Sequence, residues 1–419
     1  MASGKIVSIR CHGPKDLRLE ERDPVAPGEG EATVAIEMTG ICGSDLHYYL
    51  HGANGDFKII DPLVLGHEAG GIVTAVGPEP ASPTSKNANS QSRLKVGDRV
   101  AIECGHNCGG CRMCKEGRYN LCKASLALRC HGLDFDVWLN LARPWPRFAS
   151  QQNMRFCSSA KSHPHVDGTL QDQMNHPVSL LHKLPDGCSF EAAALAEPLC
   201  VVLHAIRRSG LRAGDRVLVL GAGAVGLLAL ALARAQGATT TIAVDIDQSR
   251  LDFAKENGWA TGTHCLERGP RVSGADAMAA GKKSWEGLKA DDIVTGVEDL
   301  DEGFDIVFEC TGVESCMQMA VYAARAGGKA MYIGMGTSAM LLPTGPSLIR
   351  EVDIMGVFRY ANVYPAALAL LGSGLLPNVE KMVTQRYPLD QAEAAFADVA
   401  RGKGANGEMV VKVMIGKRT

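Results

Sequence analysis

The segment GAGAVG at residues 221–226 constrains the fold most, because it follows the apolar run RVLVL and precedes a long Ala/Leu-rich run. A strand, a glycine-rich turn and a helix in this order form the phosphate-binding unit of a doubly wound parallel sheet. In such a unit Gly221, Gly223 and Gly226 allow the tight turn and the close approach of a pyrophosphate at the helix N-terminus. Val225, in the predicted first turn of that helix, is expected to bind the cofactor with these glycines. A glycine-rich turn of some other doubly wound sheet can have the same spacing. The flanking sequence therefore has to distinguish a dinucleotide-binding turn from such a turn.

Asp245 ends the next apolar run, TIAVD, and favours the dinucleotide interpretation. An acidic side chain at this point accepts hydrogen bonds from the ribose hydroxyls and repels a 2′-phosphate, which favours NAD over NADP. Arg250 follows in the next helical segment, where it could contact the adenosine ribose or equally lie in solvent. Later apolar runs, FDIVFE and GGKAMYIG, alternate with helical patterns, which predicts a parallel sheet covered by helices on both faces.

The overall composition excludes several other classes of protein. The chain has 419 residues, a formal net charge of −3 and 21% charged residues, so it offers no basic face for nucleic acid. The uncharged stretch at residues 217–233 is shorter than the roughly 20 residues of a membrane-spanning helix, and glycines interrupt it, so no membrane span is expected. The N-terminal residues lack the apolar core of a secretory signal, and the 14 Cys are therefore expected to be metal ligands or buried thiols in a cytoplasmic protein.

Four cysteines lie close together in the segment CGGCRMCKEGRYNLC with the spacing C-x2-C-x2-C-x7-C. Glycine and charged residues separate them, which makes a chance run of buried core thiols a poor explanation. Four thiolates on a short loop match the tetrahedral preference of zinc, and an all-sulfur set without an open position is typical of a structural site. The predicted ligands of this structural zinc are Cys108, Cys111, Cys114 and Cys122.

A second set of candidate ligands is divided among three segments. Cys42 lies in GICGSDLHYY, and the pair His67 and Glu68 lies in LGHEAGG. Glu197 lies in LAEPLC. One thiol, one imidazole and carboxylates suit a catalytic zinc ion, which keeps one coordination position open for substrate. The spacing alone leaves another interpretation open, in which the histidine and the thiol are ordinary buried residues.

These segments together resemble the zinc-dependent medium-chain dehydrogenases of the alcohol dehydrogenase superfamily. GHEAGGIVTAVG is similar to the zinc signature of that family, and the four-cysteine loop is similar to its structural zinc lobe. The segments DGTLQDQMNHP, FECTGVES and REVDIMGVFRYAN resemble most the polyol branch of sorbitol, xylitol and arabinitol dehydrogenases. The resemblance implies an α/β fold with a β-rich GroES-like catalytic domain at residues 1–199 and 358–419, and a Rossmann NAD-binding domain at residues 200–357.

The resemblance also implies roles for the scattered ligands. Cys42 and His67 would bind the catalytic zinc, and Glu68 would complete the site. Glu197 would lie close by, either as a ligand or hydrogen-bonded to the water on the zinc. The sequence does not decide between Glu68 and Glu197.

Further residues match the catalytic and substrate positions of the family. Ser44 matches the hydroxyl of its proton relay, and His47 matches the histidine that follows in that relay. Arg359 and Tyr360 match positions that face the polyol hydroxyls in the polyol branch, and Tyr48 is placed with them in the substrate site.

The expected activity is the oxidation of a polyol to a ketose by hydride transfer to NAD, in a homotetramer with two zinc ions per chain. Two alternatives remain at this stage. The protein could be a related dehydrogenase for another secondary alcohol, such as L-idonate or threonine. It could also be a catalytically inactive relative that binds NAD.

Residues 124–153 depart from the family pattern. In the polyol branch, the residues after the fourth cysteine run almost directly into a segment like MRFCSSAKS, and deleting this stretch would restore that register. We interpret it as a translated intron or a gene-model error, with a real insertion as the alternative. Residues 78–93 are expected to form a solvated loop, and residues 262–301, which lack a clear period, are expected to lengthen a surface connection.

Overall fold

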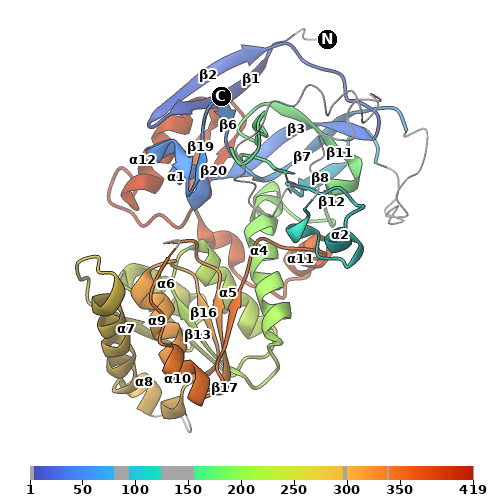
Figure 1. Ribbon diagram of the computed structural model, residues 1–419. Helices are drawn as coiled ribbons and strands as arrows, with labels where there is room; N and C mark the ends of the chain where they lie inside the picture. The colour runs from blue at the N-terminus through green and yellow to red at the C-terminus, as the bar shows by residue number, and fades with distance from the viewer. Residues whose placement is uncertain (1–3, 80–93, 124–154, 296–299, 337–338, 419) are drawn as a thin grey trace, which may run out of the picture. The chain divides into compact units, whose positions relative to one another are not determined.

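A computed structural model describes residues 4–79, 94–123, 155–295, 300–336 and 339–418 (Figure 1). The chain forms two compact units: the first comprises Met1–Leu184, Arg386–Ala397 and Met414–Thr419, and the second comprises Pro185–Gln385 and Asp398–Val413. The boundaries predicted above, after residues 199 and 357, separate a catalytic domain from an NAD-binding domain. They are a statement about function, which the division into compact units does not test, and they stay a prediction. The hypothesis on residues 124–153 lies outside the described residues, as do residues 80–93 of the expected loop.

Antiparallel β-structure dominates the first unit. The segments EATVAIEM and GHEAGGIVTAVG form β3 (Glu31–Gly40) and β7 (Glu68–Val76), which pair with each other along most of their length. They belong to a sheet with the strand order β12-β8-β7-β3-β20-β19, in which β11 also pairs with β3. The other strands of this sheet are β8 (Arg99–Ile102), β11 (Gln173–Pro177), β12 (Leu181–Lys183), β19 (Val383–Pro388) and β20 (Lys412–Gly416).

Short elements of the first unit carry the candidate metal ligands. Helix α1 (Gly43–His51) follows β3, and α2 (Arg112–Lys115) lies within the four-cysteine segment. Strand β9 (Gly105–His106) pairs antiparallel with β10 (Arg155–Phe156). A smaller sheet and a hairpin contain the strands β1 (Ile6–Gly13), β2 (Asp16–Arg22), β6 (Leu63–Val64), β4 (Ala53–Asn54) and β5 (Phe57–Lys58).

The second unit contains the predicted parallel sheet. Its strands follow the order β15-β14-β13-β16-β17-β18, and every neighbouring pair is parallel. This is the strand order of a doubly wound dinucleotide-binding sheet, in which the ligand crevice lies at the carboxyl ends of the two central strands, here β13 and β16. The strands are β13 (Arg216–Leu220), β14 (Thr240–Asp245), β15 (Gly262–Cys265), β16 (Phe304–Glu309), β17 (Ala324–Tyr332) and β18 (Asp353–Gly356).

Helices alternate with these strands, as the pattern predicts, and two further helices, α4 (Phe190–Ser209) and α11 (Tyr364–Gly372), precede and follow the sheet in the sequence. The alternating helices are α5 (Ala224–Ala235), α6 (Gln248–Glu256), α7 (Gly274–Lys289), α8 (Asp292–Thr295), α9 (Glu314–Ala323) and α10 (Thr344–Ile349). Helix α12 (Ala392–Arg401) lies near the C-terminus. The apolar stretch at residues 217–233 divides between β13 and α5. No helix in the described ranges is both long enough and apolar enough to cross a membrane.

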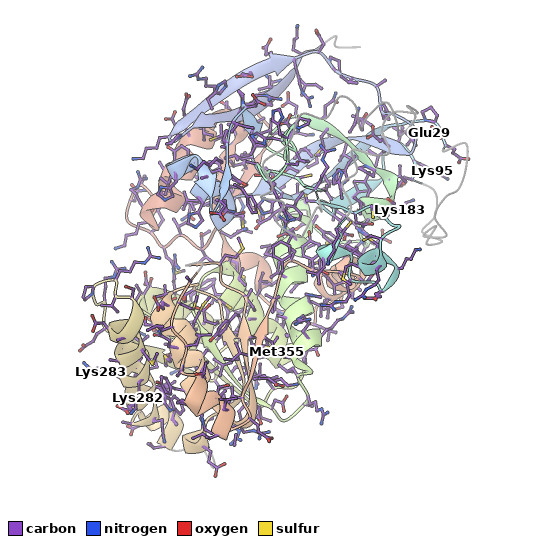
Figure 2. All side chains as sticks on the ribbon, viewed as in Figure 1. Glu29, Lys95, Lys183, Lys282, Lys283 and Met355 are labelled. Atoms are coloured by element: carbon purple, nitrogen blue, oxygen red, sulfur yellow. The ribbon has the colours of Figure 1, made fainter. Side chains whose placement is uncertain are left out.

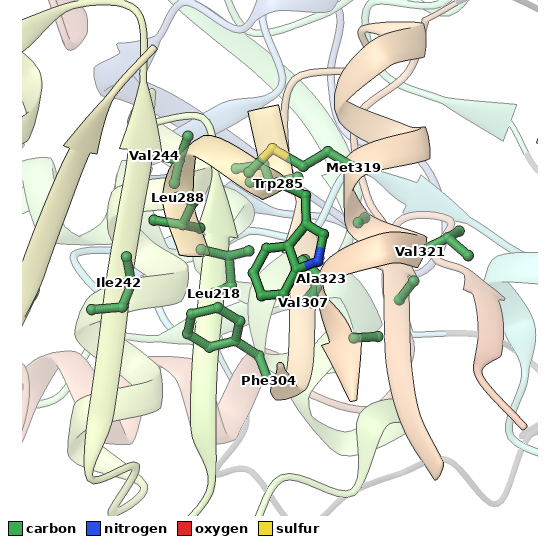
Figure 3. Packing of buried hydrophobic residues seen from close by; sticks show 14 of the residues in the cluster. Leu218, Ile242, Val244, Trp285, Leu288, Phe304, Val307, Met319, Val321 and Ala323 are labelled. Carbon is green, nitrogen blue, oxygen red and sulfur yellow. The ribbon is translucent and has the colours of Figure 1, made fainter. Parts of the chain in front are cut away.

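Buried side chains of the parallel sheet form an extended apolar core. In β13, Val217, Leu218 and Val219 are all fully buried, although side chains along a strand alternate between the two faces. Leu218 packs in one cluster with Trp285 of α7 and other residues from α9 (Figure 3). Because the strand is buried on both faces, its sequence is a continuous apolar run instead of an alternating one.

The sequence analysis found no clear period at residues 262–301, and this was wrong for the part that forms helix α7. Helix α7 occupies residues 274–289, and its buried positions are Ala277, Gly281, Trp285 and Leu288. These positions recur every three or four residues and so form one face of a helix. Lys282 and Lys283, between the buried positions, point to solvent (Figure 2).

Candidate active site and metal centres

The four cysteines of the predicted structural site lie together around α2, at whose N-terminus Cys111 is the N-cap residue. The sulfur atom of Cys111 lies 3.6 Å from that of Cys114 and 3.8 Å from that of Cys122. The sulfur atoms of Cys108 and Cys114 are 3.9 Å apart. A tetrahedral zinc ion with Zn–S bonds of about 2.3 Å separates its sulfur ligands by about 3.8 Å. The four side chains therefore fit one zinc ion.

The backbone around these cysteines favours thiolates. The N–H groups of Cys108 and Cys111 donate hydrogen bonds to the sulfur atoms of Cys122 and Cys108, over 3.4 and 3.3 Å. Burial opposes ionisation of Cys111, but backbone hydrogen bonds from Cys114 and Lys123 lower the pKa of its thiol to about 6. Burial and hydrogen bonds with Cys111 and Cys122 instead raise the pKa of the Cys114 thiol. Metal ions bind the thiolate form, so the lowered pKa of Cys111 favours one thiolate of the set before a cation binds.

A second group forms where the end of β3 and the start of β7 meet. Cys42 is the N-cap residue of α1, directly after β3, and His67 and Glu68 lie at the start of β7. The paired strands bring these segments together, because Gly40 is opposite Glu68 in the register. One ligand atom from each of the three residues lies within 4.8 Å of the other two. The structure thus unites the thiol, the imidazole and the first carboxylate that the sequence could not join by spacing.

Asp45 positions this group, and the sequence analysis missed it. Its carboxylate is 1% exposed and accepts hydrogen bonds from the backbone N–H groups of Cys42 and Gly66, over 3.0 and 3.1 Å. Ser158 donates a further hydrogen bond of 2.5 Å through its hydroxyl. The Oδ1 atom of Asp45 also lies 3.3 Å from Nδ1 of His67, which leaves Nε2 of that ring as the ligand atom. A carboxylate behind a histidine in this way fixes the orientation of a metal-binding ring.

The pKa shifts of His67 and Asp45 agree with the positioning role of Asp45. Burial disfavours the charged imidazole, yet the nearby Asp45 and Cys42 raise the pKa of His67 well above its usual range. Burial also opposes ionisation of Asp45, but the charge of His67 and the hydrogen bonds from His67 and Ser158 lower the pKa of the Asp45 carboxyl. The site therefore holds a negative charge directly behind the imidazole. This charge favours a proton on the ring when no metal is bound, and a metal ion takes the place of that proton.

We expect Asp45→Asn to lower metal affinity or activity by roughly 10–100-fold, because it removes this charge and keeps the size of the side chain. Chelator competition and kcat/KM would measure the two effects. Ser158→Ala is the matched control, since it removes one hydrogen bond to Asp45 and leaves the charge in place, and it should have a smaller effect. Equal metal affinity in Asp45→Asn and the wild type would contradict the positioning role.

The other predicted residues of the first unit lie on α1. The hydroxyl of Ser44 is 3.5 Å from Nε2 of His67, and His47 is exposed. These two residues are three positions apart and so lie on the same side of the helix. Tyr48 is buried, and its hydroxyl accepts a hydrogen bond of 3.0 Å from the backbone N–H of Ala160.

The remaining predicted site residues belong to the second unit. Glu197 lies within α4, where its side chain is 5% exposed. Arg359 has a positive φ of 50°, and its guanidinium lies over the ring of Phe358, 5.0 Å from the centroid. Tyr360 is buried and packs edge-to-face against Tyr364. The roles of these residues in zinc or substrate binding stay predictions.

The glycine-rich turn has the geometry that its sequence predicts. Gly221 follows β13 with a φ of +97°, a conformation that L side chains rarely adopt. Gly223 is the N-cap residue of α5, whose first backbone N–H groups lack partners within the helix. A Cβ atom on Gly226 would lie 1.7 Å from the carbonyl oxygen of Gly221, so the turn closes only with glycine there. The turn therefore fits a pyrophosphate at the start of α5.

Asp245 lies beside this turn at the end of β14. Its carboxylate accepts hydrogen bonds from the backbone N–H groups of Ala222, Ile246 and Asp247, over 2.6, 2.7 and 2.9 Å. It thus connects the glycine turn to the next loop. Arg250 donates a hydrogen bond of 3.1 Å to the carbonyl oxygen of Val410. Its outer nitrogen Nη1 lies 3.9 Å from where a Cβ atom of Gly223 would be.

Glu309 is the last residue of β16, the strand that pairs with β13. It is a second residue that the sequence analysis missed. Its buried carboxylate accepts hydrogen bonds from the backbone N–H groups of Thr311 and Gly312, over 2.7 and 3.0 Å. Burial raises the pKa of Glu309. This carboxylate shapes the loop at the carboxyl end of β16, beside the crevice expected for a dinucleotide.

Family models match both halves of the chain. A model described as an alcohol dehydrogenase GroES-like domain matches residues 28–186, and one described as a zinc-binding dehydrogenase matches residues 224–373. The predicted fold class, a GroES-like β-rich domain and a Rossmann domain with a parallel sheet, is therefore confirmed.

Individual proteins match over nearly the whole length. Sorbitol dehydrogenase from Gallus gallus is 36% identical over 414 residues, which cover 99% of this chain and 97% of the relative. A solved oxidoreductase of unknown specificity from Escherichia coli has a TM-score of 0.75 and 30% identity over 99% of this chain and 100% of its own. A Sinorhizobium meliloti protein, assigned as a zinc-binding dehydrogenase and solved with NADP, has a TM-score of 0.73 and 26% identity over 99% of both chains.

Proposed function

Because the chain belongs to the zinc-dependent medium-chain dehydrogenases of the alcohol dehydrogenase superfamily, in their polyol branch, we propose that it oxidises a polyol to a ketose with NAD. The substrate class is that of sorbitol, xylitol and arabinitol. The observation that carries the proposal is the group of Cys42, His67 and Glu68, in which one thiol, one imidazole and one carboxylate lie within 4.8 Å of one another. Such a set leaves a fourth position for the oxygen of an alcohol.

Each residue around this group has a proposed task. Cys42, His67 and Glu68 would hold a catalytic zinc, with Glu197 as a further ligand or a nearby base. When bound, the ion supplies Lewis acidity, which lowers the pKa of the substrate hydroxyl. Ser44 lies next to the His67 ring and would take up the proton of that hydroxyl and pass it along α1 toward the exposed His47.

The remaining site residues would bind the cofactor, the substrate and the second ion. The turn of Gly221, Gly223 and Gly226 would bind the pyrophosphate of the dinucleotide through the N-terminus of α5. Arg359 and Tyr360 would contact the polyol hydroxyls. The four cysteines around α2 would hold a structural zinc, so that the chain binds at least two zinc ions. We also propose that the enzyme is a cytoplasmic homotetramer.

The choice of NAD rests on Asp245, whose carboxylate would repel the 2′-phosphate of NADP. We expect Asp245→Asn to reduce the ratio of kcat/KM for NAD to kcat/KM for NADP by about 10–100-fold, equivalent to about 1.4–2.7 kcal/mol. Steady-state kinetics with both cofactors would measure it. Asp247→Asn is the matched control, because Asn also caps a helix well and should keep the ratio. An unchanged ratio in Asp245→Asn would contradict this role.

The activity itself is tested by following reduction of NAD with sorbitol, xylitol, arabinitol, L-idonate and threonine. We expect one or more of the three polyols to be oxidised with the highest kcat/KM. Preference for L-idonate or threonine would replace the polyol proposal by that of a related dehydrogenase. No oxidation of any of them by zinc-loaded protein would favour an inactive relative that binds NAD.

A further inference from the structure

A third cluster of metal-ligating side chains lies in the first unit, outside the two sites described above. It consists of His106 on β9, Cys157 directly after β10 and His176 on β11. Pairing of β9 with β10 sets Arg155 opposite His106, and the N–H of Cys157 donates to the carbonyl oxygen of Cys104 over 3.1 Å. Backbone pairing therefore brings His106 and Cys157 together, while His176 comes from a strand of the larger sheet.

The three side chains have the mutual geometry of a ligand set. One ligand atom of each lies within 4.8 Å of the other two. Nε2 of His106 is 3.9 Å from the sulfur atom of Cys157, and a tetrahedral zinc ion would place such a nitrogen and sulfur about 3.6 Å apart. The rings of His106 and His176 lie edge-to-face, with centroids 4.9 Å apart and planes at 80°. Shifts of a few tenths of an ångström would bring this nitrogen and sulfur to a common ion.

His176 provides a separate indication of a bound cation. It is 0% exposed, and its Nε2 atom lies 3.0 Å from the carbonyl oxygen of Glu103, to which it donates a hydrogen bond. Its Nδ1 atom, which then carries the lone pair, is buried and has no hydrogen-bond partner. A buried acceptor without a partner costs roughly 1–3 kcal/mol. A histidine that donates one N–H to a backbone carbonyl and presents its other nitrogen is the usual arrangement of a metal-bound imidazole.

The surroundings of His176 and Cys157 favour the forms of these two side chains that bind metals. Burial lowers the pKa of His176 to about 4, so its ring is neutral at neutral pH. A hydrogen bond from the Cys104 thiol and another from His106 lower the pKa of Cys157, although burial opposes ionisation. A neutral imidazole and a thiolate bind metals, whereas an imidazolium and a thiol do not.

We propose that His106, Cys157 and His176 bind a third metal ion, of the class that accepts nitrogen and sulfur ligands, with zinc as the expected occupant. The set leaves one coordination position for a water molecule or a small ligand. A cavity of about 350 Å³, lined by His106 and Cys157 together with Arg155, Asp167 and Gln171, provides space for it. The site shares no ligand with the catalytic or the structural group.

The test measures metal content in purified full-length protein and its variants. We expect the wild type to contain three zinc ions per chain, and His106→Gln and Cys157→Ser each to contain one fewer. His165→Gln is the matched control, because His165 lines the same cavity but bonds to the backbone of Ile60 and Ser162, and it should keep all three ions. Cobalt loading gives a second readout, since Cys157→Ser should lose part of the thiolate-to-cobalt absorption.

Equal metal content in His106→Gln, Cys157→Ser and the wild type would overturn the proposal. A second measurement remains decisive if these variants do not fold. If the ions lost in Cys42→Ala and Cys111→Ser together account for all the zinc of the wild type, no third ion is bound and the proposal fails. Because none of these measurements uses turnover, their outcome is independent of which alcohol the enzyme oxidises.

Discussion

Cys42→Ala is expected to lower kcat/KM for polyol oxidation by at least about 10³ and to remove one zinc ion per chain. Cys42 contributes the only thiolate of the proposed catalytic group, and the Lewis acidity of the ion accounts for several kcal/mol of transition-state stabilisation. A loss of about 4 kcal/mol corresponds to a thousandfold lower rate. The backbone N–H of Cys42, which donates to Asp45, is unchanged in the variant, so α1 should still form.

Metal analysis, kcat/KM and thermal unfolding of the same preparation separate loss of the ion from loss of the fold. Cys188→Ala is the matched control: this thiol is buried, lies next to the carbonyl of Ser189, and is outside the clusters of candidate ligands. It should keep both the metal and the activity at a small cost in stability. Retention of full activity in Cys42→Ala would contradict the proposed catalytic group.

The parallel sheet could be predicted because its strands β13, β14 and β16 are buried along most of their length and are each followed by a turn. The run RVLVL and the turn after it specify a strand, a glycine loop and a helix with little ambiguity. Helix α7 was missed for the opposite reason. Its buried face contains Gly281 in place of a larger apolar residue. No larger side chain fits there, because a Cβ atom would lie 2.5 Å from the carbonyl oxygen of Ser315 on α9. Close packing of two helices thus removed the hydrophobic residue that would have revealed the period.

The candidate site could be predicted only in part, because spacing does not encode tertiary proximity. The four cysteines are local, and their spacing was sufficient. Cys42 and His67 could be joined only through resemblance to a family, and the pairing of β3 with β7 supplies the physical reason for their contact. Asp45 had one detectable signal: it is an acidic residue three positions after an N-cap, where a carboxylate bonds back to the backbone. His106 and His176 had none, because they lie on strands of two different sheets and come together only in the tertiary structure.

The glycine turn allows a prediction that separates folding from cofactor binding. Gly226→Ala should lower the free energy of unfolding by about 3 kcal/mol or more, because its Cβ atom would lie 1.7 Å from a backbone oxygen of Gly221 that cannot move away without breaking the turn. Thermal unfolding should report a decrease in Tm of roughly 5–10 °C. Gly221 directly follows β13, whose side chains are buried in the core of the second unit, so the loss concerns that core.

Gly223→Ala is the matched variant in the same turn. It should leave Tm almost unchanged and raise the KM for NAD. Its φ of −78° is ordinary for alanine, and the nearest atom to the added Cβ is Nη1 of Arg250 at 3.9 Å, so Tm should stay within about 1 °C of the wild type. The added methyl would instead occupy the space that a pyrophosphate approaches, and the KM for NAD should rise at least about tenfold. Equal effects of the two substitutions on Tm and KM would contradict this division, because the two glycines would then serve the same purpose.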